Sequence, residues 1–456
     1  MTSLNFMQID RSRLLGLHAQ EMSRFDETHP RSRQLAQEAS RSLLSGVPMP
    51  WMTRWPGSFP LTVASAEGSR FVDVDGIEYD DFCLGDTGAM TGHGLPAVAE
   101  ALHAQAKRGI TTMLPSWDAT WVGEELARRF GLPKWQFALS ATDANRFVLR
   151  LSRMLTGRPK ICVMDWCYHG TVDETLAILA PDGGVVSRPG AVGPMVDPQG
   201  TTRVVPFNDI AALQCALAHG DVACVLMEPA LTNIGIVLPE PGYLDAVRRV
   251  TRDAGVLLII DETHTICAGP GGCTMEWGLE PDFLVIGKPI GGGVPVAAYG
   301  MSAAVAVMLE HRLERDDIDV SGIGGTLSGN ALCLAAVRAT LSSTLTTSDF
   351  MRMIPLAEAW TDGVRQGYEA VGLPWHVQRL GCRAEYWFCP PPRSGAQAVA
   401  GVDQALDAFM HLHALNRGIL MTPFHNMALF SPSHSMDQVD RHTEVFAAAV
   451  HALTAV

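Results

Sequence analysis

The chain has 456 residues, of which 47% are hydrophobic and 18% are charged, and this length suits a two-domain enzyme subunit better than one small domain. Its net charge of −14, from 34 basic and 48 acidic residues, argues against binding to nucleic acids, whose phosphate backbone attracts clustered Lys and Arg side chains.

The sequence also argues against a membrane protein, because a membrane span needs roughly 20 apolar residues and the longest strongly apolar stretch near the middle, residues 256–260, ends at Asp261. The N-terminal stretch is polar and contains no signal-peptide core. The ten cysteines stand at irregular spacings that complete no zinc site. We therefore expect a cytoplasmic protein with reduced thiols and no bound metal.

The first part of the chain predicts helices over residues 1–45, where charged and apolar residues alternate at helical spacing. Residues 48–60 contain prolines and two tryptophans, which indicates an ordered loop. A period-two pattern around residues 73–76 then predicts a β-hairpin. These three features together form an N-terminal segment, residues 1–94, that we expect to join a smaller domain.

From about residue 95 the pattern changes to helices, such as residues 96–108 and 120–130, that alternate with short apolar strands. The strands are expected at residues 134–140, 160–166, 202–207, 222–229, 255–262 and 282–288. Near-continuous apolar strands between helices are typical of a mostly parallel sheet that is buried on both faces. This region, residues 95–345, is expected to form the large domain.

The last part, residues 346–456, predicts a smaller α+β domain with apolar runs at residues 383–389 and 418–421 and a closing helix at residues 436–454. In open parallel sheets, ligands bind at the carboxyl ends of the strands. Polar residues stand just beyond several predicted strand ends of the large domain, namely Ser140, Thr142, Tyr168, His169, Glu228, Asp261 and Lys288.

Asp261 and Lys288 end two successive predicted strands. One helix between two parallel strands brings both strand ends to the same edge of the sheet. A carboxylate there is costly to bury without a cation, so the pair could form a structural salt bridge. It could also hold a pyridine ring, with the acid on the ring nitrogen and the lysine on an aldehyde, as in enzymes that use pyridoxal phosphate.

A phosphate could bind at residues 139–157, which predict a strand end, a short Ser-Ala-Thr turn and a long helix. The N-terminus of a helix offers free N–H groups that bind phosphate. An ordinary helix N-cap at Ser140 or Thr142 predicts the same local structure. Tyr168, which follows another strand, could cover the face of the ring or simply pack in the core.

The order and spacing of these motifs resemble the class III (subgroup II) aminotransferases of the fold-type I pyridoxal phosphate family. The resemblance is closer to the branch of glutamate-1-semialdehyde aminomutase and β-amino-acid aminotransferases. It covers nearly the whole chain and implies an α/β fold with a large domain around a mostly parallel seven-stranded sheet plus a smaller α+β domain. The implied cofactor is pyridoxal 5'-phosphate.

The implied activity is amino transfer between an amino acid or amine, including β- or ω-amino compounds, and a keto acid or aldehyde. The alternative is a glutamate-1-semialdehyde-type 2,1-aminomutase, which moves the amino group within one molecule. The Gly- and Pro-rich residues 180–202 could form the mobile gating loop of an aminomutase or a plain surface loop. A third possibility is a non-catalytic binding protein of the same fold.

The resemblance also implies a role for each residue of the motifs. "GK" implies that Lys288 forms the Schiff base and moves the proton, "IIDE" that Asp261 pairs with the ring nitrogen, and "YHG" that Tyr168 stacks on the ring. Further cofactor contacts are implied for Ser140, Ala141 and Thr142 in "SAT", His169, Thr263, and Glu228 and Asn233 in "EPALTNIG". In "GGTLSGNAL", Thr326 is expected to reach the cofactor phosphate of the neighbouring subunit of a homodimer.

Three departures from the family pattern concern the substrate more than the cofactor. Ala141 stands where the phosphate loop usually has glycine, and Thr263, followed by His264, stands where the family has valine under the ring. The arginine that often follows a few residues later is absent from "THTICAGPGG".

Substrate contacts are expected at two arginines, because substrate carboxylates usually bind an arginine fork. Arg54, in "WMTRWPG", lies where β-amino-acid aminotransferases place a substrate arginine, and Arg383, in "GCRAEYWF", is a second candidate. His425, in "TPFHNMALFS", stands near the position of another arginine of that branch. Trp51, with Met52 and Trp55, could line an apolar pocket or pack in the core.

Overall fold

The computed structural model describes residues 9–192, 197–314 and 319–455. The chain divides into two compact units. Unit 1 contains Met1–Leu95, Ser348–Pro391 and Gly401–Val456, and unit 2 contains Pro96–Thr347 and Pro392–Ala400. Residues 392–400 thus group with unit 2, although they lie in the C-terminal stretch that was expected to form part of the smaller domain.

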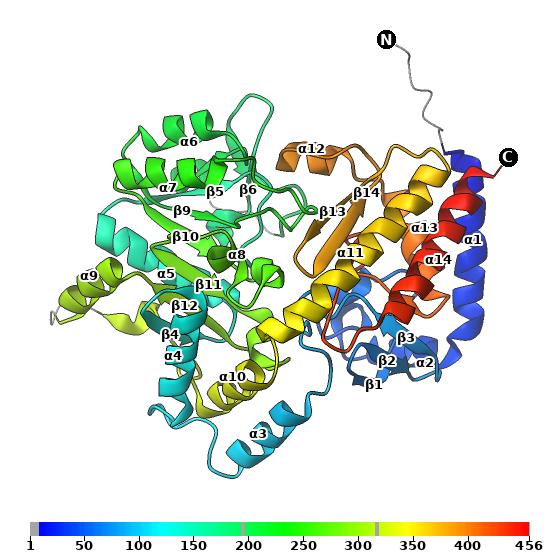
Figure 1. Cartoon of the computed structure of the whole chain (residues 1–456), viewed down its shortest axis with the longest axis horizontal. Coiled ribbons are helices and arrows are strands. Elements are labelled where there is room, and N and C mark those ends of the chain that lie inside the picture. Colours follow the sequence, from blue (N-terminus) through cyan, green and yellow to red (C-terminus); the bar gives the residue numbers. More distant parts are fainter. Residues whose placement is uncertain (1–8, 193–196, 315–318, 456) are drawn as a thin grey trace. The chain divides into compact units, whose positions relative to one another are not determined.

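Unit 2 is built on a seven-stranded sheet in the order β4-β12-β11-β10-β9-β5-β8 (Figure 1). The strands are β4 (Lys134–Ala138), β5 (Lys160–Met164), β8 (Thr202–Val205), β9 (Val222–Met227), β10 (Leu257–Asp261), β11 (Phe283–Ile286) and β12 (Ala297–Met301). Neighbours from β8 through β11 pair in parallel, and only β12 runs antiparallel to the strands beside it, β4 and β11. The predicted mostly parallel α/β sheet is confirmed, and β12 is a strand that the sequence analysis did not name.

The inner strands of this sheet are largely buried, whereas the edge strand β4 is partly exposed. Every residue of β9, β11 and β12 is buried, and successive side chains of a strand point to opposite faces. Helices α5 (Ala141–Thr156), α6 (Ile210–Leu217) and α7 (Tyr243–Asp253) pack against the strands. The other helices of this part are α3 (Pro96–Ala106), α4 (Asp118–Phe130), α8 (Gly272–Glu276), α9 (Ala303–Leu313), α10 (Ala331–Ser343) and α12 (Gly395–Ala400).

The segment predicted as a gating or surface loop, residues 180–202, is only partly described, because residues 193–196 lie outside the described ranges. Its first part forms a two-stranded hairpin of β6 (Ala177–Leu179) and β7 (Val185–Ser187). A short 3-10 helix, Pro198–Gly200, leads into β8.

Unit 1 contains a four-stranded sheet, β1-β2-β3-β15, and a three-stranded sheet, β13-β14-β16. The strands are β1 (Val63–Glu67), β2 (Arg70–Asp73), β3 (Glu78–Asp81), β13 (His376–Leu380), β14 (Arg383–Trp387), β15 (Ile419–Leu420) and β16 (Met427–Leu429). The predicted hairpin joins β2 to β3, and the Asp73 carboxylate stabilises its turn by accepting hydrogen bonds from the N–H groups of Asp75 and Ile77, each 2.9 Å long.

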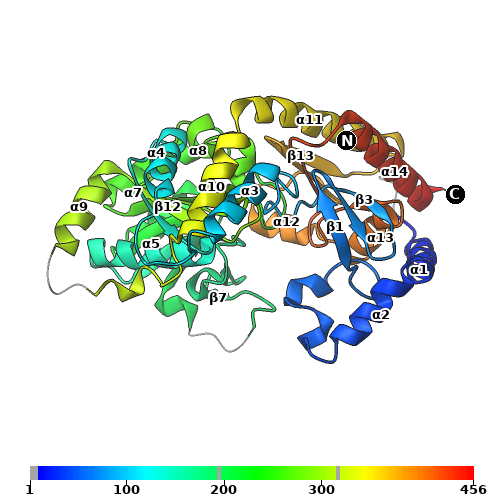
Figure 2. The ribbon, with the colours of Figure 1, turned by 90° about the horizontal axis from the view of Figure 1, so that it is seen from below.

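The helices of this part are α1 (Arg11–Thr28), α2 (Pro30–Ala39), α11 (Thr347–Ala370), α13 (Gln404–Leu415) and α14 (Met436–Thr454). Helix α13 packs against β15 and α1 (Figure 2). The proline-rich loop includes a short 3-10 helix, Pro50–Thr53. Across the described residues, we find no helix with the length and apolar character that crossing a membrane requires.

Unit 1 buries several histidines in neutral form. The His442 ring on α14 lies 5.1 Å from the ring of Trp360 and 5.3 Å from that of Phe82, measured between centroids. Its Nδ1 finds no hydrogen-bond partner among the described residues. Burial lowers the pKa of His442 to about 3 and lowers the pKa of His411 and of His434 to about 4.

These buried histidines make unit 1 sensitive to acid. Above the ordinary histidine pKa, about 6.5, these rings are neutral in both the folded and the unfolded state, so they do not lower the free energy of unfolding. Below it, the unfolded chain binds protons that the folded state excludes, and the free energy of unfolding falls by about 1.4 kcal/mol per pH unit for each such histidine.

We therefore expect His442→Phe to flatten the pH dependence of stability. Between about pH 7.5 and pH 5, the wild type should lose about 2 kcal/mol more than the variant, because the variant has no ring to protonate. Urea unfolding followed by circular dichroism at each pH measures this difference. If the free energy of unfolding fell equally with pH in the two proteins, His442 would not be buried in neutral form.

Candidate functional site

The two residues expected to carry the chemistry stand at neighbouring strand ends. Asp261 is the last residue of β10, and Lys288 follows the end of β11 by two residues. The two strands pair in parallel, with Asp261 opposite Val285. The topology therefore brings the acid and the amine to one edge of the sheet, as the sequence predicted.

Asp261 is held by four hydrogen bonds although it is only 3% exposed. Oδ1 accepts from the backbone N–H of Thr263 at 3.0 Å and from its hydroxyl at 2.5 Å. Oδ2 accepts from Asn145 Nδ2 and from His169 Nδ1, both at 2.9 Å. Burial alone would raise the pKa of Asp261, but the hydrogen bond and charge of His169, with Thr263 and Asn145, lower it to about 2.

His169 carries the opposite charge. Burial alone would lower the pKa of this histidine, but Cys167 and Asp261 outweigh that effect and raise it to about 10. At neutral pH the pair is therefore an imidazolium and a carboxylate. The His169 ring is hydrogen-bonded to the Asp261 carboxylate. Any contribution of His169 to a ligand site therefore acts through Asp261.

Lys288 is held in an unusual backbone conformation. Its φ of +50° lies in the left-handed region, which non-glycine residues rarely adopt. Its Nζ lies 2.8 Å from Nε2 of His264. Strained backbone of this kind concentrates at functional sites, where the surrounding structure fixes it.

Gly287 lets the lysine loop approach the start of α5. A Cβ at this position would lie 3.3 Å from the Cβ atoms of Ala141 and Ala297, closer than most side chains tolerate. The methyl group of Ala141, which replaces the usual glycine of the phosphate loop, therefore lies on the side of Gly287. The lysine loop and the expected phosphate loop are in direct contact.

The start of α5 also meets the turn after β5. Ser140 caps the helix, because its Oγ accepts from the N–H of Asp143 at 3.2 Å, and the expected Ser-Ala-Thr turn is thus the N-cap and first turn of α5. Thr142 Oγ1 accepts from the N–H of Thr171 at 3.1 Å. Gly170 is required here, since a Cβ would lie 2.0 Å from Thr142 Oγ1.

The remaining residues predicted to contact the cofactor differ in their burial and in their hydrogen bonds. Asn233 Nδ2 donates to the carbonyl oxygen of Trp166 at 3.2 Å, two residues before half-buried Tyr168. Glu228 is buried and accepts a hydrogen bond from the Thr232 hydroxyl. Thr326 is exposed in the turn after Gly325, and no hydrogen bond of its side chain to the cluster is seen in the described parts of the chain.

Three residues that the sequence analysis did not select stand at the cluster. Asn145 lies four residues after Ala141, so helical spacing could have placed it on the same face of α5. His264 was noted only as a departure from the family pattern. The Arg188 guanidinium lies 5.4 Å from the centroid of the Trp166 ring and donates to the carbonyl oxygen of Trp166 at 3.2 Å.

The four predicted substrate residues all lie in unit 1, and a chain of contacts links three of them. The Trp51 ring packs edge-on against Phe424 at 5.1 Å between centroids, and Phe424 lies 5.3 Å from the His425 ring. His425 Nδ1 and Arg383 Nη2 both contact the Glu385 carboxylate, at 2.9 Å and 3.2 Å.

The charge of Arg383 is matched inside the protein, because the residue is fully buried and paired with Glu385. Burial alone would raise the pKa of Glu385, but His425 and Arg383 lower it below its usual value. Arg54, by contrast, is exposed at the end of the 3-10 helix Pro50–Thr53.

An apolar cavity of about 580 Å³ lies within unit 1. Met52 and Trp55 line it, together with side chains of α2 and of the β1-β2-β3 sheet, whereas Trp51 packs on Phe424 instead. His93 and Asp81, whose side chains pair at 2.7 Å, also line this cavity.

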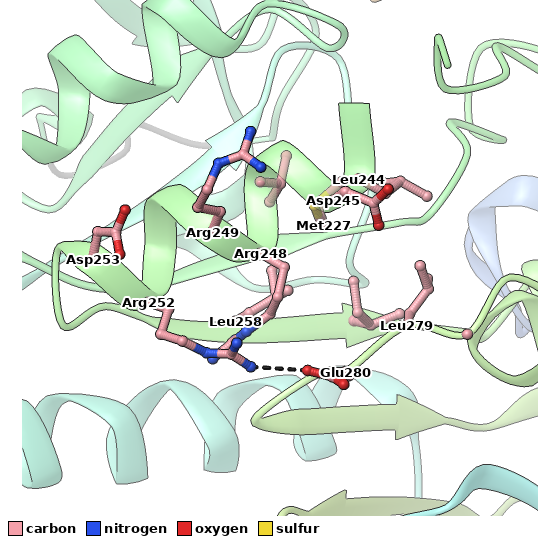
Figure 3. A pocket seen from close by; sticks show the side chains of 13 residues that line it. Met227, Leu244, Asp245, Arg248, Arg249, Arg252, Asp253, Leu258, Leu279 and Glu280 are labelled. Carbon is pink, nitrogen blue, oxygen red and sulfur yellow. Dashed lines mark hydrogen bonds and ion pairs between the residues drawn. The ribbon is translucent and has the colours of Figure 1, made fainter. Parts of the chain in front are cut away.

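A second cavity, of about 450 Å³, lies beside α7 in unit 2 (Figure 3). Its lining includes three arginines, but Arg248 pairs with Asp282 at 2.8 Å. Arg252 pairs with Glu280 at 2.9 Å, and a dashed line marks this pair in Figure 3. None of the predicted site residues lines it. The cluster at the ends of β10 and β11 therefore remains the candidate site, and no metal-binding group of His, Cys, Asp or Glu occurs in the described ranges.

The cluster offers three kinds of group to a ligand. The first turn of α5 presents N–H groups that have no partner within the helix, which suits a phosphate. Asp261 presents an ionised carboxylate, which suits a protonated ring nitrogen, and Lys288 presents an amine, which suits an aldehyde. These residues could hold a cofactor that carries all three groups.

Comparisons with known proteins agree with this arrangement. The family model for class-III aminotransferases matches residues 51–361. A glutamate-1-semialdehyde 2,1-aminomutase of Sorangium cellulosum is 35% identical over 90% of this chain and 94% of that protein. A crystal structure of a glutamate-1-semialdehyde aminomutase from Pseudomonas aeruginosa PAO1, in complex with PMP, is 49% identical, has a TM-score of 0.94 and covers 98% of this chain and 99% of that chain.

An omega-transaminase from Sphaerobacter thermophilus is also similar in structure, with 28% identity, a TM-score of 0.84, and coverage of 94% of this chain and 99% of that chain. The family model spans well over half of the sequence and includes every residue of the strand-end cluster. The chain belongs to the class-III aminotransferase family.

Proposed function

We propose that this chain is a pyridoxal phosphate-dependent 2,1-aminomutase, which moves an amino group between neighbouring carbons of one amino aldehyde of the glutamate-1-semialdehyde type. One observation carries the amino-transfer chemistry: ionised Asp261 and Lys288 lie at the ends of the neighbouring strands β10 and β11, beside the start of α5. Relatives named as this aminomutase, 31% to 35% identical, support the intramolecular reaction ahead of the two-substrate transamination that the sequence favoured first.

The residues of the cluster fit the cofactor. Asp261 would hold the protonated ring nitrogen, the first turn of α5 with Ser140, Ala141 and Thr142 would hold the phosphate, and Tyr168 would cover the ring. Pyridoxal phosphate supplies an electron sink that makes the Cα hydrogen of a bound amine acidic. Asn145, His169 and Thr263 keep Asp261 ionised, which strengthens that effect.

Lys288 has two tasks in this proposal. Its amine would bind the aldehyde of the cofactor, and once the substrate amine has replaced it, Nζ would be free to carry the Cα proton. The strained backbone at Lys288 and the close packing of Gly287 fix the point from which the side chain reaches. Arg54 is the proposed contact for the substrate carboxylate.

A two-substrate transaminase is the second candidate, and the similarity to an omega-transaminase supports it. Both reactions use the same groups and differ in whether a separate acceptor takes the amino group. We also propose a homodimer in which exposed Thr326 reaches the cofactor phosphate of the neighbouring subunit.

The substrate requirement separates the two candidates. Purified holoenzyme given the amino aldehyde alone should form the rearranged amino acid, with no keto acid or amino donor added, because one molecule supplies and receives the amino group. Chromatography of the product measures this. Turnover that requires an added keto acid would favour the transaminase instead.

Lys288→Ala should lower turnover by at least about 10³-fold, because it removes both the covalent anchor and the proton carrier. The visible absorbance of lysine-bound cofactor should also disappear. Lys160→Ala is the matched control, since Lys160 lies at the opposite end of the sheet strand β5 and bonds the carbonyl oxygen of Gln199 at 2.8 Å. Equal activity of the two variants would remove Lys288 from the reaction.

Asp261→Asn should lower kcat by about 10²-fold or more while the circular dichroism spectrum stays unchanged, because an amide does not keep the ring nitrogen protonated. The wild type loaded with a cofactor analogue that has carbon in place of the ring nitrogen should lose activity by a similar factor. The same analogue in Asp261→Asn should cause little further loss. Full additivity of the two losses would show that Asp261 acts elsewhere.

A further inference from the structure

His264 contacts the amine of Lys288, which carries the proton in the proposed reaction. Its Nε2 lies 2.8 Å from Nζ of Lys288, and both side chains are half-buried. His264 comes three residues after the end of β10, and Lys288 comes two residues after the end of β11. Because these strands are parallel neighbours, the contact follows from the topology that places the acid and the amine together.

The sense of this hydrogen bond depends on the charge of Lys288 and on the tautomer of His264. An ammonium group can only donate, and a neutral imidazole accepts through the ring nitrogen that carries no hydrogen. A charged Lys288 therefore donates to Nε2 of His264.

His264 and His169 have separate positions in the cluster. His169 Nδ1 bonds Asp261 Oδ2, and Asn145 and Thr263 supply the other described hydrogen bonds to that carboxylate. His169 thus bonds the carboxylate of Asp261, and His264 contacts the amine of Lys288.

We propose that His264 is a positioning residue that holds the Lys288 amine whenever that amine is not bound to the cofactor. This inference rests on the proposed function, in which the substrate amine displaces Lys288. The released amine sits on a flexible four-carbon stem, and it must stay within reach of the proton that it takes from Cα and gives back. A hydrogen-bond acceptor beside the cofactor site keeps it there, and misplacement by about 1 Å can cost a factor of about 10² in rate.

The proton balance of this step is simple. Nζ takes the Cα proton with its lone pair and becomes an ammonium group, one of whose N–H bonds points to Nε2 of His264. The ammonium group then gives one proton back to the substrate–cofactor adduct and is neutral again. No oxidant, reductant or further reactant takes part.

The test compares His264→Asn with His264→Gln in the full-length chain. The amide of Gln reaches the position of Nε2 and still accepts a hydrogen bond, whereas the shorter amide of Asn does not reach it. The two variants have the same polarity, so they separate the contact from a general effect on folding. His219→Asn, at an exposed position in unit 2, is the control.

The first readout needs no cofactor and no activity. The chain has only four lysines, Lys107, Lys134, Lys160 and Lys288, so competitive acetylation followed by mass spectrometry reports each one, with three as internal references. Acetylation of Lys288 relative to the others should rise about fivefold in His264→Asn, because a charge-assisted hydrogen bond that engages the amine is lost. It should stay near the wild-type rate in His264→Gln and in the control.

The second readout uses the holoenzyme. His264→Asn should lower kcat about tenfold or more with little change in KM, because in the holoenzyme the contact forms only once the substrate amine has displaced Lys288, and His264→Gln should recover most of the loss. Unchanged acetylation of Lys288 in His264→Asn would overturn the inference, even if the wild type binds pyridoxal phosphate through Lys288. A wild type that shows no visible band after incubation with pyridoxal phosphate would instead overturn the proposed function, so the two failures are distinguishable.

Discussion

The buried carboxylate of Asp261 is the constraint on which the rest of the candidate site depends. An ionised acid at the end of a central strand is unfavourable unless charges and donors surround it. Here His169 supplies the charge, and Asn145 and Thr263 supply the donors. These partners come from α5, from the turn after β5 and from the residues after β10, so satisfying one carboxylate brings three segments together.

Close backbone packing then sets the distance between the acid and the amine. Gly287 and Gly170 allow the loops after β11 and β5 to press against the first turn of α5. A Cβ would collide with Thr142 at Gly170 and would be tightly packed against Ala141 at Gly287. Lys288 takes its strained φ of +50° in this setting. The backbone is therefore closely packed where the cofactor would be held, and the Lys288 amine lies 2.8 Å from Nε2 of His264.

In unit 1, buried charged groups pair with one another. Arg383 and Glu385 neutralise each other in its interior, and His425 joins them. Histidines such as His442 are buried without charge against aromatic rings. Arg383 and Glu385 inside this unit are thus committed to each other, whereas Arg54 is exposed.

The sequence by itself predicted the mostly parallel sheet, because six near-continuous apolar runs between helices are typical of strands in such a sheet. It also placed Asp261 and Lys288 at one edge, since successive parallel strands end there. Strand β12 escaped notice because its Ala-, Gly-rich run "AAYGM" has weak strand propensity and forms only by pairing between β4 and β11. The contacts of Asn145 with Asp261 and of His264 with Lys288 were decided by tertiary structure alone, because side-chain partners that distant in sequence are chosen by packing and leave no local pattern.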